Sequence, residues 1–564
     1  MPTNFKALAE LGEKLEATRK HLLMIDVVSE FLERLEPREV EPAVSMLLGR
    51  PFPKWSQQTL EVSWTTLSEV IKRTTGVEWN IFEEAFRRSG DIGSATRTVF
   101  EKSKIKRQAV LFEEALTLLE VRRSLEAIAG TVGYGSRGRK ERLVTALLSR
   151  CSPLEAKYLV KVLIGDMRTG FHEGLMEQAV SKAFQTPLKS VREATMIMSD
   201  IGEVAAIAKT EGAEGLARKG FVVFRPVNLM LAQISDDVAG ALAEHDGRTA
   251  FEYKYDGARV QIHKSGDEVR IYSRRLTDVT DSLPEVVEMV KGNVRASEAI
   301  LEGEVIAVDH SGSPIAFQHL MRRFRRVHSI EDMVERIPVR LYLFDILYID
   351  GKSMISTSYL QRRQILSENA GRVPLTVQTV TADVQEAQRF LEKAMSEGNE
   401  GLMAKRVDSG YTPGIRGKRW LKIKPVLESL DLAIVAAEYG YGRRHGWLSD
   451  YYLAARDAET GEFLPVGKTF KGLTDAEIIG MTKRLKELAV KRERGRVVVL
   501  PRVVVEVAYN EIQRSPKYEC GMALRFARIT RVREDKSPDE VDTIQKVRDI
   551  YERQFLKKGR YKTG

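Results

Sequence analysis

The chain has 564 residues, 43% of them hydrophobic, which is enough for about three or four domains with separate cores. Its net charge of +10 suggests a polyanionic partner, usually nucleic acid, although a soluble basic protein without one would look the same. Only two cysteines, Cys151 and Cys520, are present, which excludes a cysteine-rich zinc module and disfavours a disulfide framework. The N-terminus has no signal-peptide core, and no apolar run approaches membrane-spanning length, so a soluble, cytoplasmic protein without membrane contact is expected.

The N-terminal part of the chain has a helical pattern. Apolar residues recur every three or four positions in segments such as 25–35, 109–129 and 154–163. Short connectors with Gly, Pro or Ser separate these segments, and strand-like alternation is scarce. We therefore predict an all-α domain over residues 1–224.

The pattern changes near Arg225-Pro226, where short alternating segments rich in Val, Ile, Tyr and Phe begin. The predicted strands are 250–255, 259–263, 268–272, 299–308 and 339–348. Residues 264–267 have the composition of a hairpin turn, and helical patches occupy 283–291 and 384–396. Residues 225–428 are thus predicted to form an α+β domain with largely antiparallel sheets.

A third domain is predicted over residues 429–564. Its expected strands are 432–437, 451–456, 464–468 and 503–509, with a helix over 476–491. Short strands with one helix suit a small β-barrel of the oligonucleotide-binding type (OB-fold). A C-terminal helix is expected over 538–555.

A candidate nucleophile, Lys254, lies in the run Glu252-Tyr253-Lys254-Tyr255-Asp256-Gly257-Ala258-Arg259. A lysine amine attacks only after losing its proton, and its ordinary pKa is about 10.4. A second cation in a partly dry pocket lowers that pKa, and Arg259 could supply this charge and also grip a phosphate. Taken alone, the run fits a β-hairpin with a surface lysine equally well.

Five further segments have a composition suited to a nucleotide site. They are 272–275, 301–304, 342–345, 400–405 and 420–424. In the last, Trp420, Lys422 and Lys424 share one face of a strand because strand side chains alternate. Two lysines facing a pocket would attract phosphates, whereas on a solvent-facing strand they would be ordinary.

The order and identity of these segments resemble the nucleotidyltransferase motifs of ATP-dependent DNA ligases, which RNA ligases and mRNA capping enzymes share more loosely. Residues 525–529 and 533–536 resemble the last motif of that superfamily, in the small barrel. The helical domain, through 133–136 and 168–171, resembles the DNA-binding domain of archaeal and eukaryotic replicative ligases. The resemblance spans essentially the whole chain, and its length and domain order are closest to the archaeal enzymes.

The resemblance implies an enzyme that seals nicks in duplex DNA during replication, repair and recombination. Its AMP donor would be ATP and its metal Mg²⁺. Lys254 would attack the α-phosphate, Glu252 would receive the adenine amino group, and Phe344, otherwise an ordinary core residue, would stack on the base. The other implied nucleotide contacts are Arg259, Arg274, Glu304, Arg416, Lys422, Lys424, Arg525 and Arg528. Glu304 and Glu400 are the implied metal ligands.

Three of these assignments have alternatives: Arg416, the activity and the AMP donor. Arg416 lies in the cation-rich stretch Gly414-Ile415-Arg416-Gly417-Lys418-Arg419, so Lys418 or Arg419 could take its place. The K-x-D-G-x-R run also occurs in RNA ligases and capping guanylyltransferases, although about 220 helical residues argue against capping. A non-catalytic DNA-binding protein with the same fold is disfavoured because Lys254, Glu304, Lys422 and Lys424 are all present. NAD as AMP donor is disfavoured by the missing four-cysteine module.

The candidate DNA contacts cluster around the Gly-Ser connector of the helical domain. They are Arg137, Arg139, Lys140, Arg142 and Arg168, and a solvated basic loop is the alternative. The basic run 322–326 is a second candidate, or else a charged helix surface. We expect a monomer with hinges near 225 and 428, and a sliding-clamp contact for which 108–112 is a poor match.

Overall fold

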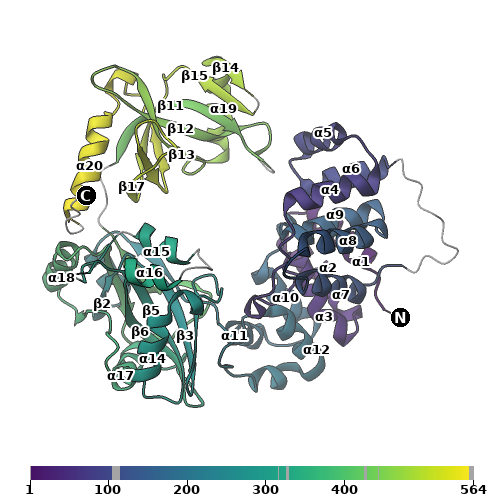
Figure 1. Ribbon diagram of the computed structural model, residues 1–564, viewed down its shortest axis with the longest axis horizontal. Coiled ribbons are helices and arrows are strands. Elements are labelled where there is room, and N and C mark those ends of the chain that lie inside the picture. Colours follow the sequence, from purple (N-terminus) through teal and green to yellow (C-terminus); the bar gives the residue numbers. More distant parts are fainter. Residues whose placement is uncertain are drawn as a thin grey trace.

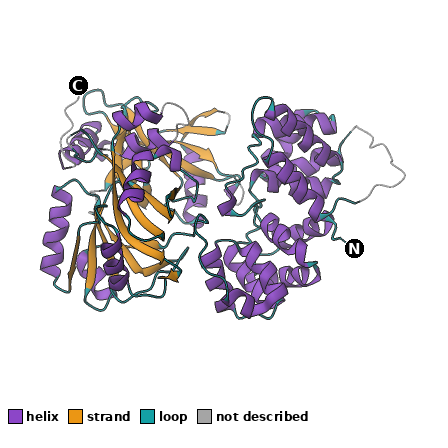
Figure 2. Cartoon of the chain, turned by 60° about the horizontal axis from the view of Figure 1, so that its bottom comes forward, coloured by secondary structure: helices purple, strands orange, loops and turns teal. Residues whose placement is uncertain are grey.

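The computed structural model describes residues 2–103, 115–310, 312–315, 317–324, 330–424, 429–441, 444–493 and 495–557. A helical part lies beside two parts that are built on β-sheets (Figures 1 and 2). Within these ranges no helix is both long and apolar enough to span a membrane.

The N-terminal part is helical, as predicted, and one core of buried side chains runs through it. Local sequence fixes several helix starts. The Ser152 side chain, for example, accepts a hydrogen bond from the Glu155 amide, and the Ser152 amide donates one to the Glu155 carboxylate. Its helices are α1 (Phe5–Glu16), α2 (His21–Arg34), α3 (Pro37–Leu47), α4 (Trp64–Thr75), α5 (Trp79–Ser89), α6 (Ile92–Glu101), α7 (Leu118–Ala129), α8 (Ser136–Ser149), α9 (Pro153–Ile164), α10 (Glu173–Ala183), α11 (Leu188–Met198) and α12 (Ile201–Ala217). The segment predicted over 109–129 is helical from Leu118; its first residues, 109–114, lie outside the described residues.

The central part contains two five-stranded sheets. Strand pairing is antiparallel throughout them except between β1 and β10, which confirms the predicted sheet type. In order across the first sheet, the strands are β1 (Leu231–Ser235), β10 (Arg416–Ile423), β9 (Gly401–Arg406), β2 (Thr249–Lys254) and β8 (Gln378–Thr381). The second sheet has the order β4 (Glu268–Ser273), β3 (Ala258–Ser265), β5 (Glu298–Ala307), β6 (Val339–Ile349) and β7 (Lys352–Ser353). The helices here are α13 (Val238–Glu244), α14 (Pro284–Asn293), α15 (Phe317–Phe324), α16 (Ile330–Arg336), α17 (Tyr359–Asn369) and α18 (Val384–Ser396).

The run around Lys254 is not a β-hairpin. β2, which ends at Lys254, belongs to the first sheet, and β3, which contains Arg259, belongs to the second. The chain crosses between the sheets at Gly257, where a Cβ atom would lie 2.5 Å from the carbonyl oxygen of Val305. The hairpin predicted at 264–267 is present between β3 and β4, with Gly266 at a φ of 56°.

The C-terminal part is also built on a sheet, in which β11 pairs with β12, β15 and β16. Its elements are β11 (Leu430–Tyr439), β12 (Leu448–Arg456), β13 (Phe463–Thr469), α19 (Asp475–Glu487), β14 (Ala489–Glu493), β15 (Arg496–Val499), β16 (Val504–Ala508), β17 (Glu511–Arg514), β18 (Met522–Arg525), β19 (Arg528–Val532) and α20 (Ile544–Lys557). The recorded pairings of its described strands do not close into a ring. The helix predicted over 476–491 is wrong at its end, because residues 489–493 form β14 and pair with β15, and that pairing overrides helix propensity.

His263 joins the second sheet to the chain that arrives from the helical part. Its ring is buried in β3, where Nδ1 accepts a hydrogen bond from the Phe224 amide at 2.9 Å and Nε2 lies 3.0 Å from Gln261 Oε1. Burial disfavours the charged imidazolium and lowers the pKa of His263 to about 3.

We expect this histidine to make the fold acid-sensitive. The unfolded chain binds the proton below about pH 6.5 and the folded chain only near pH 3, so stability falls as pH drops between these values, by about 1.4 kcal/mol per pH unit. Hydrogen exchange of the β3 and β4 amides in wild type and His263→Asn at pH 7, 6 and 5 measures this locally. Equal losses in the two proteins would contradict it.

Candidate active site

Lys254 and Glu400 meet because their strands are neighbours. β2 pairs with β9 so that Lys254 faces Gly401, and the Glu400 amide donates to the Lys254 carbonyl at 2.8 Å. The Lys254 Nζ atom lies 2.6 Å from Glu400 Oε2, and the Nζ of Lys424 lies 2.5 Å from the same oxygen. One carboxylate therefore holds two ammonium groups.

The protonation of Lys254 differs from the sequence-based expectation. Burial lowers its pKa, but the carboxylates of Glu400 and Glu304 outweigh burial, so the pKa is raised. Arg259 does not lower it, because its guanidinium donates to Glu302 Oε2 at 2.7 Å and is itself neutralised. In this state Lys254 is a paired ammonium group.

Glu304 brings a carboxyl group from the second sheet to the same place. It lies in β5, and burial raises its pKa to about 7, against the opposing effects of Lys254 and Arg259. A carboxyl group with this pKa exchanges protons near neutral pH. Two acidic groups with different proton affinities, Glu400 and Glu304, thus act on Lys254.

Lys422 lies among other cations. Burial comes first in lowering its pKa, and four positive neighbours lower it further: Lys424, Lys254, Arg416 and Arg274. A cluster of positive charge with a partly buried member favours an anionic ligand.

The geometry distinguishes Arg416 from its two alternatives. Arg416 acts on Lys422 electrostatically, whereas Lys418 pairs with Glu244 at 2.8 Å. The guanidinium of Arg419 donates to the Gly410 carbonyl at 3.5 Å. Arg416 is therefore the member of this stretch that belongs to the cationic cluster.

Arg259 is partly buried and makes several hydrogen bonds within the central part. It donates to the Met230 carbonyl at 2.7 Å and to the Tyr411 hydroxyl at 3.2 Å, besides Glu302. Its Nε is a buried donor with no hydrogen-bond partner among the described residues, so a bound ligand could supply an acceptor there.

The environment of Glu252 contains residues that sequence reasoning did not single out. Its carboxylate is 2% exposed, pairs with Lys405 Nζ at 2.7 Å, and accepts hydrogen bonds from the Tyr359 hydroxyl and from Gln378 at 3.1 Å. Tyr359 and Gln378 are 107 and 126 residues away along the chain, so no local pattern could have revealed them. Lys405 belongs to the segment 400–405 that the sequence pointed to, but only the pairing of β2 with β9 brings it to Glu252.

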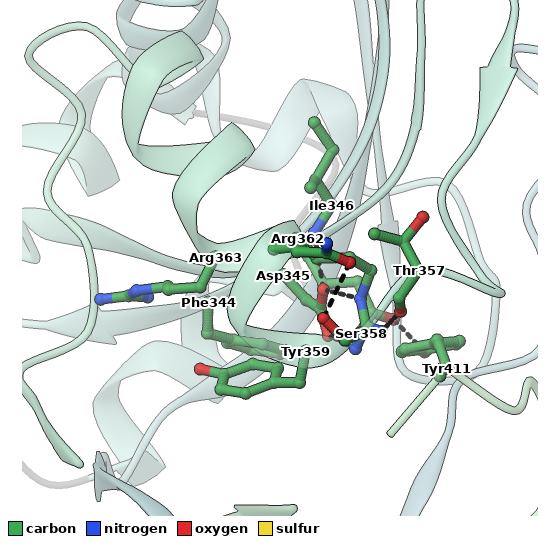
Figure 3. A network of polar contacts seen from close by, with 12 residues as sticks. Phe344, Asp345, Ile346, Thr357, Ser358, Tyr359, Arg362, Arg363 and Tyr411 are labelled. Carbon is green, nitrogen blue, oxygen red and sulfur yellow. Dashed lines mark hydrogen bonds and ion pairs between the residues drawn. The ribbon is translucent and has the colours of Figure 1, made fainter. Parts of the chain in front are cut away.

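Phe344 occupies the boundary between this site and a small core. It is 8% exposed and its ring meets Trp420 edge-on at 6.0 Å. Figure 3 shows Tyr359, Arg362 and Arg363 projecting from α17 beside Phe344 and Asp345 of β6. The buried ion pair of Asp345 and Arg362 thus holds the part of β6 that contains Phe344.

Arg525 and Arg528 lie on the C-terminal part, which Figure 1 shows apart from the two central sheets. Arg525 pairs with Glu511 of the same part at 3.2 Å, and Arg528 is exposed. This structure therefore does not bring them to Lys254.

Most of the predicted DNA contacts lie near the start of α8, whereas Arg168 follows α9. Arg137 lies 3.5 Å from Glu69, and Arg139 donates to the Val132 carbonyl at 2.8 Å. Lys140 differs from them, since it is buried and pairs with Glu61 at 3.1 Å. Arg168 pairs with Asp166 at 2.6 Å and also donates to the Gly90 carbonyl.

The basic run 322–326 is not a uniform charged surface. Arg323 is 2% exposed and pairs with Glu285. Its Nε also donates to the Ser282 carbonyl at 2.8 Å, so this arginine holds α15 in place. The surface interpretation is wrong for Arg323, while 325 and 326 lie outside the described residues, as does the clamp candidate 108–112.

Comparison with known proteins finds relatives that match nearly the whole chain. Residues 4–181 match the DNA ligase N terminus, 229–424 the ATP dependent DNA ligase domain, and 444–536 the ATP dependent DNA ligase C terminal region. The chain is 46% identical to DNA ligase 1 of Korarchaeum cryptofilum, over 98% of this chain and 99% of that protein. It is 44% identical to the DNA ligase of Thermococcus fumicolans, over 97% and 98%. A solved structure described as "Pmar-Lig_PreS3" has the same fold, with a TM-score of 0.57 at 17% identity over 93% of this chain and 99% of that one. The chain belongs to the ATP-dependent DNA ligase family.

Proposed function

We propose that the chain seals nicks in duplex DNA through a covalent AMP adduct on Lys254. The Nζ of Lys254 would form a bond to the α-phosphorus of ATP, and the bond to pyrophosphate would break. AMP would then pass to the 5′-phosphate at the nick, and the 3′-hydroxyl would displace it. The observation that carries the proposal is the partly buried lysine at the edge of a cationic cluster, with acidic groups from both sheets beside it.

The amine must lose a proton before it attacks, and the site offers two acceptors. Glu400 lies 2.6 Å from Nζ, but its own pKa is lowered, since Lys254 and Lys424 outweigh its burial. Glu304, with a pKa of about 7, has the better matched proton affinity and would serve as the acceptor only while it does not ligate Mg²⁺. Arrival of the nucleotide phosphates would draw Lys422 and Lys424 toward the new negative charge and loosen their hold on Glu400.

The acidic groups also fit Mg²⁺. No group of three or more His, Cys, Asp or Glu side chains in the described part of the chain could hold a metal alone. Mg²⁺ usually takes one or two carboxylates and completes its shell with phosphate oxygens and water, which suits Glu304 and Glu400. When bound, the ion would neutralise phosphate charge.

The remaining assignments follow the family motifs. Glu252 would receive the adenine amino group, Phe344 would stack on the base, and Arg259 would offer Nε to the ribose or phosphate. Further phosphate or ribose contacts are proposed for Arg274, Arg416, Lys422 and Lys424. The C-terminal part is proposed to be an OB-fold that closes over the nucleotide with Arg525 and Arg528, and the domains are proposed to be 1–224, 225–428 and 429–564.

The helical part is proposed to hold the duplex by its backbone. α8 begins after Gly133 and Gly135, which have φ values of 80° and 71°, and no side chain caps its first amides. A helix start with free amides and cations such as Arg137 and Arg142 is a phosphate site. A sliding clamp and a monomeric state stay predictions.

Removing Arg137 and Arg142 tests this surface. The variant Arg137→Ala/Arg142→Ala should bind nicked DNA of any sequence more weakly, and the slope of log affinity against log salt should fall by up to about 2. The control, Lys189→Ala/Arg192→Ala, removes the same charge from α11 and should leave the slope unchanged. Equal changes in both variants would show a general charge effect instead of a contact.

A further inference from the structure

Lys405 is a buried cation that the proposed phosphate chemistry does not use. It lies in β9 with 1% of its surface exposed, and its Nζ contacts Glu252 Oε2 at 2.7 Å. Three aromatic rings surround this ammonium, with centroids 4.5 Å (Phe344), 4.8 Å (Tyr359) and 4.4 Å (Trp420) away. Burial lowers the pKa of Lys405, and the carboxylate of Glu252 opposes that effect, while the aromatic faces favour the position of the ammonium.

The Glu252 carboxylate is held from both ends. Oε1 accepts hydrogen bonds from the Tyr359 hydroxyl and from the Gln378 amide, while Oε2 faces Lys405. A carboxylate has about four acceptor positions. In the described part of the chain, the Tyr359 hydroxyl, the Gln378 amide and the Lys405 ammonium fill three of these positions. One acceptor position, on Oε2, is left for a donor from a ligand.

The charge of Glu252 decides which purine can use that position. An ionised carboxylate only accepts hydrogen bonds, so it fits the 6-amino group of adenine and opposes the 6-oxo group of guanine. A protonated carboxyl group also donates, and would then accept guanine. The discrimination therefore depends on the cations that face this carboxylate, which are Lys405, with Nζ 2.7 Å from Oε2, and Arg363, with its guanidinium 3.7 Å from Oε1.

We propose that Lys405 is a positioning residue for nucleobase selection, which holds the Glu252 carboxylate in place as a hydrogen-bond acceptor so that the site takes adenine and rejects guanine. This rests on the proposed function of Glu252 and Lys254. Lys405 acts through Glu252 and makes no contact with the phosphates.

The test is the preference for ATP over GTP in the first step. Lysine–AMP and lysine–GMP formation are measured by single-turnover labelling of the full chain, which gives kcat/KM for each nucleotide. In Lys405→Met the ATP/GTP preference should fall roughly 10- to 100-fold, because an opposing acceptor is removed and a donor is gained. The loss with ATP should be mainly in KM.

Two comparisons separate selection from damage to the fold. Lys264→Met removes another buried lysine of the same two sheets, which donates to the Ala296 carbonyl at 2.7 Å, and it should leave the preference unchanged. In a Glu252→Gln background, adding Lys405→Met should not change the preference further, since the charge on which Lys405 acts is gone.

Several outcomes overturn the proposal. An unchanged ATP/GTP ratio in Lys405→Met, at whatever total rate, reduces Lys405 to a structural lysine. If wild-type protein uses ATP and GTP equally, the proposed base selection is wrong, but the proposed covalent chemistry is unaffected. If wild-type protein forms no adduct with either nucleotide, the proposed function itself is wrong. If Lys405→Met does not fold, Tyr359→Phe is measured in its place: a lowered preference supports the proposal and an unchanged one overturns it.

Discussion

Lys254→Ala is expected to abolish the protein–AMP adduct and leave the fold intact. The lysine ends β2, and its side chain is 22% exposed, so its removal creates little cavity. Glu400 keeps a partner in Lys424, 2.5 Å away, so no carboxylate is stranded. The intact mass after incubation with ATP and Mg²⁺ reports the adduct directly, and it should rise by one AMP in the wild type only.

The three proposed steps allow a sharper form of this experiment. A nick that already carries AMP on its 5′-phosphate bypasses the lysine, so Lys254→Ala should seal it while failing on an ordinary nick. Lys418→Ala is the control, since this lysine is 62% exposed and pairs with Glu244 outside the cationic cluster. Adduct formation by Lys254→Ala would show that another residue is the nucleophile.

Arg362→Met is expected to destabilise the central part by about 3–5 kcal/mol, because it strands a buried charge. Both Arg362 and Asp345 have fully buried side chains, joined by hydrogen bonds of 2.7 and 2.9 Å (Figure 3). Arg362 also donates to the carbonyls of Thr357 and Ser409, at 2.6 and 3.1 Å. One side chain thus ties α17 to β6 and to the loop that follows β9.

Hydrogen exchange of the β6 and α17 amides measures this effect locally, which matters because a multidomain chain has no single unfolding free energy. Arg531→Met is the matched control. It breaks a 2.6 Å ion pair with Glu506 at the surface, and should cost about 0–1 kcal/mol. The double variant Asp345→Leu/Arg362→Met should recover part of the loss, since no charge remains buried. Equal protection in Arg362→Met and wild type would show that the pair contributes nothing.

Much of the fold follows from local pattern. The helix predicted over 384–396 is α18 itself, and the strand predicted over 339–348 is β6 to within one residue. Such elements depend on periodicity that a short window contains. The helix predicted to 491 failed where β14 pairs with a strand that the window does not include. The hairpin interpretation of the Lys254 run failed for the same reason, because strand partners are chosen by tertiary contacts.

The sequence by itself determined which residue types stand in which order: a lysine at a strand end, an acidic pair, an alternating Trp-Lys-Lys face, and the family to which these belong. Only the tertiary structure decided what Lys254 experiences. The register of β2 against β9 places Glu400 2.6 Å from its amine, and this raises a pKa that a neighbouring arginine alone would have lowered. The physical reason is that electrostatic effects depend on distance and burial, which chain order does not specify for residues over a hundred positions apart.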